Sequence, residues 1–312
     1  MTEKTLPVLE IKGSKPQGMA GFIWSRYRKH TGAVAGMIVL SLLILAVLLA
    51  GLSPYDPETS DMDSRFAPPS WQHPLGTDAL GRDLLTRILY GGRISLAVGF
   101  SVVCITLLIG VPVGAIAGYF GGPVDNILMR ITDAALTLPS LLVLILLSAV
   151  LREVNAPLIE KNPVITIAMV IGLLSWMFVA RLVRAAYISI REQDYVMAAR
   201  TLGATDLRII VKHILPNAVG PIIVESTLEI GYAILEESGL SFLGFGIKPP
   251  TPSWGNLLSN AQDHMTKHPW LAIFPGIMIF LTIISINYIG DGLRDAFDPH
   301  KVMKGIGEKK QV

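Results

Sequence analysis

The 312-residue chain is unusually apolar, with 51% hydrophobic and only 16% charged residues. Soluble domains carry about 25% charged residues, so this composition predicts an integral membrane protein. The formal net charge of +2 gives no case for nucleic-acid binding. The single cysteine, Cys104, cannot form a disulfide within the chain and lies in an apolar run.

Six apolar stretches are long enough to form membrane-spanning helices, which need about 20 predominantly apolar residues. The first is too long, and starts too far into the chain, to be a cleaved signal peptide. We therefore predict an all-α integral membrane protein with six transmembrane helices. The predicted spans are residues 33–52, 94–118, 126–151, 163–185, 217–237 and 271–290.

The distribution of Lys and Arg predicts the orientation. Of the 26 basic residues, 17 lie in segments 1–32, 181–216 and 291–312, and eight lie in segments 53–93, 152–162 and 238–270. Because basic residues are enriched in cytoplasmic loops, both termini are predicted to be cytoplasmic. The chain then consists of a cytoplasmic segment 1–32, the first span 33–52, an extracytoplasmic loop 53–93, a membrane domain 94–291 and a cytoplasmic tail 292–312. The stretch "MAGFIWSRYRKH" before the first span suits a helix lying in the membrane interface.

The stretch "YVMAARTLGATDLRIIVKHILPN", Tyr195–Asn217, is a polar interruption between spans. It predicts a first helix that stops at Gly203, because glycine adopts the left-handed conformation without cost. Thr205 is a suitable N-cap for a second helix, and Pro216 is expected to close that helix. The result is a short helical hairpin on the cytoplasmic surface, which either rests on lipid headgroups or docks a partner.

Two segments on the predicted outer side differ in character. Residues 80–89 place leucines and an isoleucine at helical spacing, which predicts an amphipathic helix lying along the outer surface before the second span. Residues 238–252 are rich in Gly, Phe and Pro, which predicts an irregular loop. Such a loop is tolerated at membrane depth only where it lines a cavity or is covered by protein.

Three carboxylates in the fifth span fall on one helical face. At about 100° per residue, Glu225, Glu229 and Glu236 lie within roughly 40° of one another. Charges at membrane depth usually face a cavity or a partner. One hypothesis is that they line a path through the membrane and attract an ammonium group or a divalent cation. The alternative is that they lie at the interface or pair with a partner chain.

Arg130 and Asp133 lie near the start of the third span and are expected to form a structural ion pair, with each other or with a neighbour. Pro139 follows them and is a candidate kink. The chain contains no P-loop, H-E-x-x-H or G-x-S-x-G motif, so it is not expected to be an enzyme or to use ATP unaided. His264 and His268 have helical spacing but no third ligand, so no metal site is expected.

The segment Met197–Pro216 resembles the EAA loop of ABC importer permeases, with the pattern E-A-A, three residues, G, nine residues, I-x-L-P. Met197 stands where this pattern has Glu, and His213 where it has Ile. Contact with an ATPase is therefore expected to depend on packing more than on charge. The residues that match at the expected spacing are Ala198, Ala199, Gly203, Leu215 and Pro216.

The resemblance extends over most of the chain beyond residue 30. It is closest to the dipeptide/oligopeptide/nickel branch of these permeases, to its C-type subunit, and within that to dipeptide permeases. The segments that carry it are His73–Gly99, Ala117–Leu142, Leu240–Leu258 and Asn287–Pro299. It implies the type I ABC importer permease fold in a bacterial cytoplasmic (inner) membrane, and cargo that is a dipeptide, an oligopeptide, nickel or another small solute.

The resemblance also implies partners. These are a second, related permease in a heterodimer, two cytoplasmic ATPases that hold ATP and Mg, and an extracytoplasmic substrate-binding protein; this chain itself binds no cofactor. The loop 192–216 would couple to one ATPase. The outer segments would contact the binding protein or gate the path, through Leu84, Ile88, Phe242, Phe245 and Trp254, or would simply be packed loops. An autonomous channel, an ion-coupled carrier and a membrane scaffold are the alternatives from other classes.

Overall fold

The computed structural model describes residues 19–153 and 162–298. Within these ranges, regular secondary structure is helical apart from one isolated bridge between Thr77 and Asp83. The predicted segments 1–32 and 292–312 lie partly outside the described residues. The helix expected before the first span is α1 (Met19–Tyr27), in which the Trp24 ring stacks on the Tyr27 ring at 5.8 Å.

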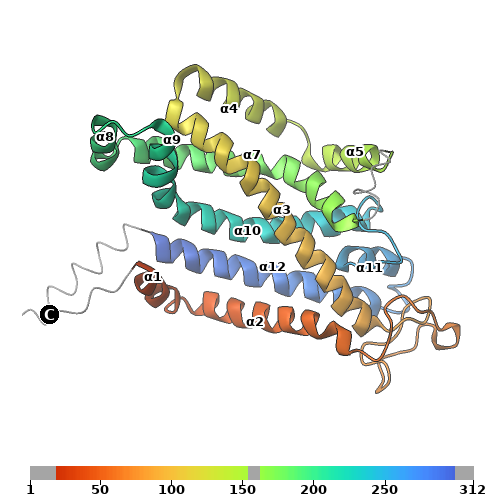
Figure 1. The fold of residues 1–312 in the computed structure, drawn as a ribbon. Coiled ribbons are helices and arrows are strands. Elements are labelled where there is room, and N and C mark those ends of the chain that lie inside the picture. The colour runs from red at the N-terminus through yellow and green to blue at the C-terminus, as the bar shows by residue number, and fades with distance from the viewer. Residues whose placement is uncertain (1–18, 154–161, 299–312) are drawn as a thin grey trace, which may run out of the picture.

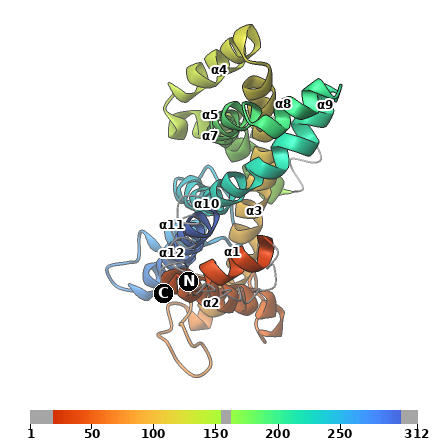
Figure 2. The ribbon, with the colours of Figure 1, turned by 90° about the vertical axis from the view of Figure 1, so that its left-hand side faces the viewer.

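The long helices lie side by side in one slab (Figures 1 and 2). Its order is α2, α12, α10, α7, with α4 and α5 along the edge beyond α7, while α3 crosses the slab obliquely. The segment between α2 and α3 lies at one end of the slab, together with α11 (Trp254–Ala261). The helices α8 (Asp194–Thr201) and α9 (Asp206–Arg208) lie at the other end. The helices that build the slab are α2 (Thr31–Leu48), α3 (Leu84–Phe120), α4 (Gly122–Leu136), α5 (Ser140–Glu153), α7 (Pro163–Arg191), α10 (Leu215–Phe242) and α12 (Trp270–Phe297).

Five helical stretches in the described ranges are long and apolar enough to cross a membrane. The pair α4 and α5 makes a sixth if it counts as one span. The six predicted spans are therefore all present as apolar helices, with the third one broken. The five unbroken stretches are Thr31–Leu52, Leu84–Phe120, Pro163–Arg191, Asp206–Phe242 and Trp270–Phe297.

The third span is not the continuous helix predicted over 126–151. It consists of α4 and α5, which meet at an angle of 89°. The break precedes α5 at Pro139, because proline disfavours helical geometry in the residue before it and lacks a backbone N–H. Of the two charged residues near its start, Asp133 forms an ion pair with Arg181 on α7, so its partner is a neighbouring helix.

The surface helix predicted over residues 80–89 is also corrected by the structure. It is the first part of α3, a single helix of 37 residues that starts at Leu84. Asp83 begins it, because its carboxylate accepts the Thr86 backbone N–H at 2.8 Å. At about 1.5 Å per residue, α3 exceeds the roughly 30 Å apolar core of a bilayer, so the helix extends beyond the membrane.

Three glycines let α3 pack closely on α7. Gly110, Gly114 and Gly118 are four residues apart and share one face of α3. A Cβ on Gly114 would overlap the Ala180 carbonyl oxygen and lie 2.8 Å from Val183 Cβ. Because no side chain separates the two backbones here, α3 and α7 form one closely packed pair.

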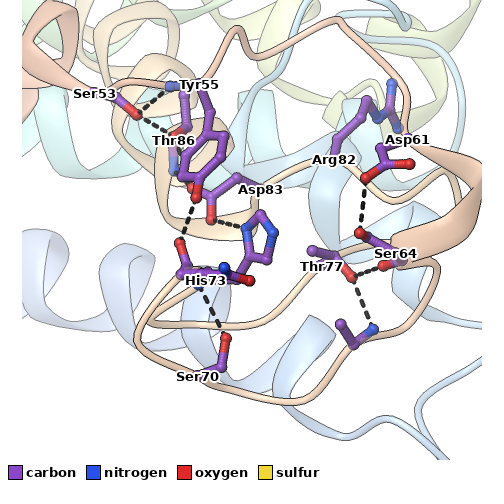
Figure 3. A network of polar contacts seen from close by, with 12 residues as sticks. Ser53, Tyr55, Asp61, Ser64, Ser70, His73, Thr77, Arg82, Asp83 and Thr86 are labelled. Carbon is purple, nitrogen blue, oxygen red and sulfur yellow. Dashed lines mark hydrogen bonds and ion pairs between the residues drawn. The ribbon is translucent and has the colours of Figure 1, made fainter.

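A polar network orders the loop 53–83 between α2 and α3 (Figure 3). His73 Nδ1 lies 2.9 Å from the Asp83 carboxylate, which also begins α3. Ser53 and Thr86 share a hydrogen bond of 2.5 Å, which ties the end of the first span to α3. The Tyr55 ring packs on the His73 ring at 4.8 Å. The loop is therefore a fixed cap on this end of the slab.

Candidate functional site

A cleft of about 490 Å³ lies between α7, α10 and the bend of α4 and α5. Glu225, Glu229 and Glu236 of α10 all line it, as their shared helical face predicts. Ser175 of α7 lines the same cleft. The rest of the lining is largely apolar and includes Tyr232. The structure thus brings together all three carboxylates, which stand on one wall of one cleft.

The α10 wall of the cleft is acidic. Glu229 is 6% exposed, and the other two carboxylates are half-buried. Among the described residues that line the cleft, none is Lys, Arg or His. Because a buried carboxylate is costly without a compensating partner, this wall favours a bound cation over an anion. An ammonium group or a metal cation fits this requirement.

Glu225 has a second environment. It also borders a cleft of about 520 Å³, which it shares with Arg294 and Asp295 near the end of α12. The carboxylate therefore stands between two openings, one of which contains a basic side chain. Of these two clefts, Glu229 and Glu236 line the first alone, where no basic side chain stands beside them.

A fourth carboxylate of α10, which the sequence reasoning missed, holds the helix in place. Glu237 is fully buried and accepts hydrogen bonds from Ser95 on α3 at 3.0 Å and from Ser241 at 2.7 Å. The same hydroxyls accept the backbone N–H groups of Trp254 and Ile247. Glu237 thus ties α10 to α3 and to the loop before α11 (Trp254–Ala261). The sequence signal that could have revealed Glu237 is Ser241, a hydroxyl four residues later on the same helical face.

The five outer residues named from the sequence do not share a surface. Leu84 and Ile88 are each 1% exposed, and they belong to the same buried cluster as Trp254. The Trp254 indole N–H donates to the Ile88 carbonyl at 2.9 Å. These three side chains are core residues in this conformation and are not presented to a partner. Phe242 is exposed at the end of α10, and Phe245 is partly buried.

The segment 192–216, called the 192–216 hairpin below, starts with α8 (Asp194–Thr201) as predicted. Gly203 then has a φ of +82°, the left-handed conformation that glycine tolerates. Thr205 occupies the N-cap position of α9 (Asp206–Arg208), but its side chain makes no capping hydrogen bond. The two arms of the hairpin therefore meet at Gly203.

The sequence predicted that the second arm ends at Pro216, and the structure corrects this. It continues through a π-helical segment, Ile209–Ile214, into α10 without a break in helical structure. Pro216 lies in the first turn of α10, directly after the π-helical segment, so its missing backbone N–H falls where the helix changes from π to α geometry. Leu215 precedes it and is partly buried. The hairpin is thus directly continuous with the helix that carries the cleft carboxylates.

The exposed side of the 192–216 hairpin mixes apolar residues with charged ones such as Arg200, Asp206 and Arg208. Met197 and Ala198 are exposed, Ala199 is partly buried, and Gly203 has nothing within 4 Å of a Cβ position. The sequence reasoning missed two further members of this surface, Leu202 and Leu207, which are 87% and 72% exposed. Their signal was a pair of leucines beside a glycine turn in a segment too short to bury them. The hairpin thus exposes one leucine on each side of Gly203, and it carries no bulky side chain at Ala198.

Comparison with known proteins identifies the family. A model of the family described as "Binding-protein-dependent transport system inner membrane component" matches residues 110–302. The chain belongs to this family. A second model, "N-terminal TM domain of oligopeptide transport permease C", matches residues 21–69 of this family member. Members are membrane permease subunits of ABC transporters and are not themselves catalytic.

Individual relatives cover nearly the whole permease. The di/tripeptide transport system permease protein DppC of Pseudomonas aeruginosa is 41% identical, over 88% of this chain and 90% of that protein. The oligopeptide transport system permease protein OppC of Bacillus subtilis is also 41% identical, over 88% and 87%. A solved chain of the MetNI methionine ABC transporter, in an inward-facing conformation, matches with a TM-score of 0.54 at 18% identity, over 67% of this chain and 95% of that chain. This likeness shows that the permease has the type I ABC importer permease fold.

The described part of the permease offers no obvious metal site. Within residues 19–153 and 162–298, no group of three or more His, Cys, Asp and Glu side chains is placed to hold a metal ion. His268 instead stacks on the Phe66 ring with centroids 4.3 Å apart, and His264 meets the same ring at a steep angle, at 4.8 Å. Their helical spacing thus serves aromatic packing against the loop 53–83.

Proposed function

We propose that this chain forms half of the translocation pathway for dipeptides or short peptides in an ATP-driven importer. The observation that carries this proposal is the cleft of about 490 Å³, with three carboxylates on its α10 wall and apolar side chains around them. A peptide at neutral pH has an ammonium group that suits the carboxylates, and side chains that suit the apolar lining. The peptide permeases that are about 40% identical over most of the chain support this cargo.

Around this chain we place a heterodimeric partner permease, two cytoplasmic ATPases that bind ATP and Mg, and an extracytoplasmic substrate-binding protein. The family description, which names an inner membrane component of binding-protein-dependent transport, supports an inner-membrane assembly with a binding protein. Both termini and the 192–216 hairpin face the cytoplasm in this proposal, as the Lys and Arg bias favours. Phe242 and Phe245 then lie on the side of the binding protein and are the residues proposed to contact it or gate the path.

The 192–216 hairpin is the proposed docking site for one ATPase. It exposes two leucines at its tip, and it continues directly into α10, which carries the carboxylates. ATP binding by the docked subunit biases the permease between inward-open and outward-open states, because it stabilises one of them. The residues proposed for this contact are Met197, Ala198, Ala199, Gly203, Leu215 and Pro216.

The test is transport by the purified assembly in proteoliposomes. We expect uptake of a labelled dipeptide that requires ATP, the ATPases and the binding protein together. Uptake by this chain alone would indicate an autonomous channel or carrier instead. Nickel is the second candidate cargo, because an acidic wall attracts a divalent cation by its field without coordinating it. ATP-dependent uptake of labelled nickel with no uptake of dipeptide would favour it.

A bulky residue at Ala198 should weaken ATPase docking. Ala198 is exposed on α8, so Ala198→Leu leaves the fold of the isolated chain intact while it holds a closely packed partner away. We expect the amount of ATPase that co-purifies with the importer to fall by about tenfold, which corresponds to roughly 1.4 kcal/mol of lost contact. Ala198→Ser changes the volume little and should retain the ATPase. Equal recovery with both variants would contradict docking at this surface.

A further inference from the structure

The end of α3 is joined to both arms of the 192–216 hairpin by one side chain. The Tyr119 hydroxyl donates to the Asp206 carboxylate at 2.5 Å. The Arg200 guanidinium lies over the Tyr119 ring, 5.6 Å from its centroid. Arg200 belongs to α8 and Asp206 begins α9, so Tyr119 contacts the hairpin on either side of its glycine turn.

A second contact joins α7 to the same point. Arg191, at the last turn of α7, donates to the Gly118 carbonyl at 2.9 Å and to the Tyr119 carbonyl at 3.3 Å. These carbonyls lie in the last turn of α3, where they accept no hydrogen bond from a later residue of the helix. A basic side chain therefore stabilises them. Together with the glycine packing along α3 and α7, the contact makes the ends of these two helices one unit.

The connection from the hairpin to α10 is of another kind. It runs through the π-helical segment Ile209–Ile214, whose wider turns are rare and are concentrated at functional sites. The Tyr187 hydroxyl of α7 donates to the Ile210 carbonyl at 3.2 Å, so even this segment is held to α7 at its start. The hairpin is therefore fixed to α3 and α7 by side chains, whereas α10 follows through irregular helix.

We propose that Tyr119 is a positioning residue that makes α3 and α7 follow the 192–216 hairpin when the ATPase moves it. α7 and α10 supply facing walls of the carboxylate cleft. When α7 moves with the hairpin, it moves relative to α10, which is joined to the hairpin only through the π-helical segment. This relative movement changes the width of the cleft. The inference rests on the proposed function, since it takes the hairpin as the ATPase contact. Beyond that function, the Tyr119 contacts give the route by which movement of the hairpin reaches the cleft.

The test measures the number of peptides transported per ATP hydrolysed by the complete importer in proteoliposomes. Tyr119→Phe keeps the ring under Arg200 but removes the hydroxyl that donates to Asp206. We expect the transport ratio to fall by about fivefold or more, within the range of coupling between sites. The ATPase subunits should co-purify in normal amounts, because Tyr119 is only 6% exposed.

Three further variants separate coupling from stability. Asp206→Ala should give the same loss as Tyr119→Phe, and the double variant should be no worse than either single one, since all remove one contact. Asp206→Asn retains an acceptor oxygen and should preserve the ratio. Tyr288→Phe, a matched change on α12, should have no effect.

Two results would overturn the inference. One is a normal ratio of transport to hydrolysis in Tyr119→Phe. The other is a loss of bound ATPase in that variant, which would assign the contact to assembly. Failure of the proposed function would look different, because the unmodified importer would then hydrolyse ATP without any uptake of peptide.

Discussion

Replacing Glu229 by glutamine should lower the rate of dipeptide uptake by the assembled importer by about tenfold. Glu229 is the most buried of the three carboxylates on the cleft wall. Glutamine keeps the size of the side chain and an acceptor oxygen, but it loses the negative charge that attracts the peptide ammonium. A hydrogen bond to a charged group is worth roughly 1.5–3 kcal/mol, so tenfold is the lower end of the expected loss. Initial rates with a labelled dipeptide measure it.

The cargo itself supplies a sharper version of this experiment. A dipeptide with an acetylated N-terminus lacks the ammonium, so its slow uptake should be the same in the unmodified importer and in the Glu229→Gln variant. Asp263→Asn is the matched control, because Asp263 is exposed outside the cleft. Normal dipeptide uptake by a fully assembled Glu229→Gln importer would exclude the carboxylate from the pathway.

A single methyl group at Gly114 should destabilise the fold. In Gly114→Ala the new Cβ overlaps the Ala180 carbonyl oxygen, so α3 and α7 must separate. Overpacking of this kind costs about 1–3 kcal/mol. In a chain of this size we expect the midpoint of thermal unfolding to fall by roughly 5 °C. The measurement is a thermal scan of the purified importer in detergent or nanodiscs.

Gly239→Ala is the matched control for this prediction. Gly239 lies inside α10, and a Cβ there meets nothing within 4 Å. Alanine is the better helix former by about 1 kcal/mol, so this change should be neutral or stabilising. If both variants unfold at the same temperature, the close approach of α3 and α7 does not limit stability.

The spans were predictable because an apolar run of about 20 residues has few other uses. What the sequence did not reveal were the places where distant residues decide local geometry. Arg87 is an example, since it suits the polar side of a surface helix. In the structure it is fully buried, and its guanidinium donates to the Pro57 carbonyl at 2.6 Å. Because that acceptor lies 30 residues earlier, periodicity along α3 carries no sign of it.

The candidate site shows the same contrast between what helical periodicity predicts and what distant contacts decide. The common face of Glu225, Glu229 and Glu236 follows from helical geometry alone, and the structure places all three in one cleft. Glu237, one residue further, faces another direction and is enclosed by serines from separate elements. Sequence periodicity assigns a residue to a face, but it does not say whether that face meets a cavity or a packed core.

The right-angled break between α4 and α5 has a consequence for hydration. Leu138 and Ser140, on either side of Pro139, line the carboxylate cleft. Backbone groups interrupted at membrane depth are tolerated only beside water or under a covering of protein. Because the break borders this cleft, we expect water in the cleft to satisfy these groups and to raise the local dielectric constant. This solvation lets three carboxylates share one wall while the pathway waits for its cargo.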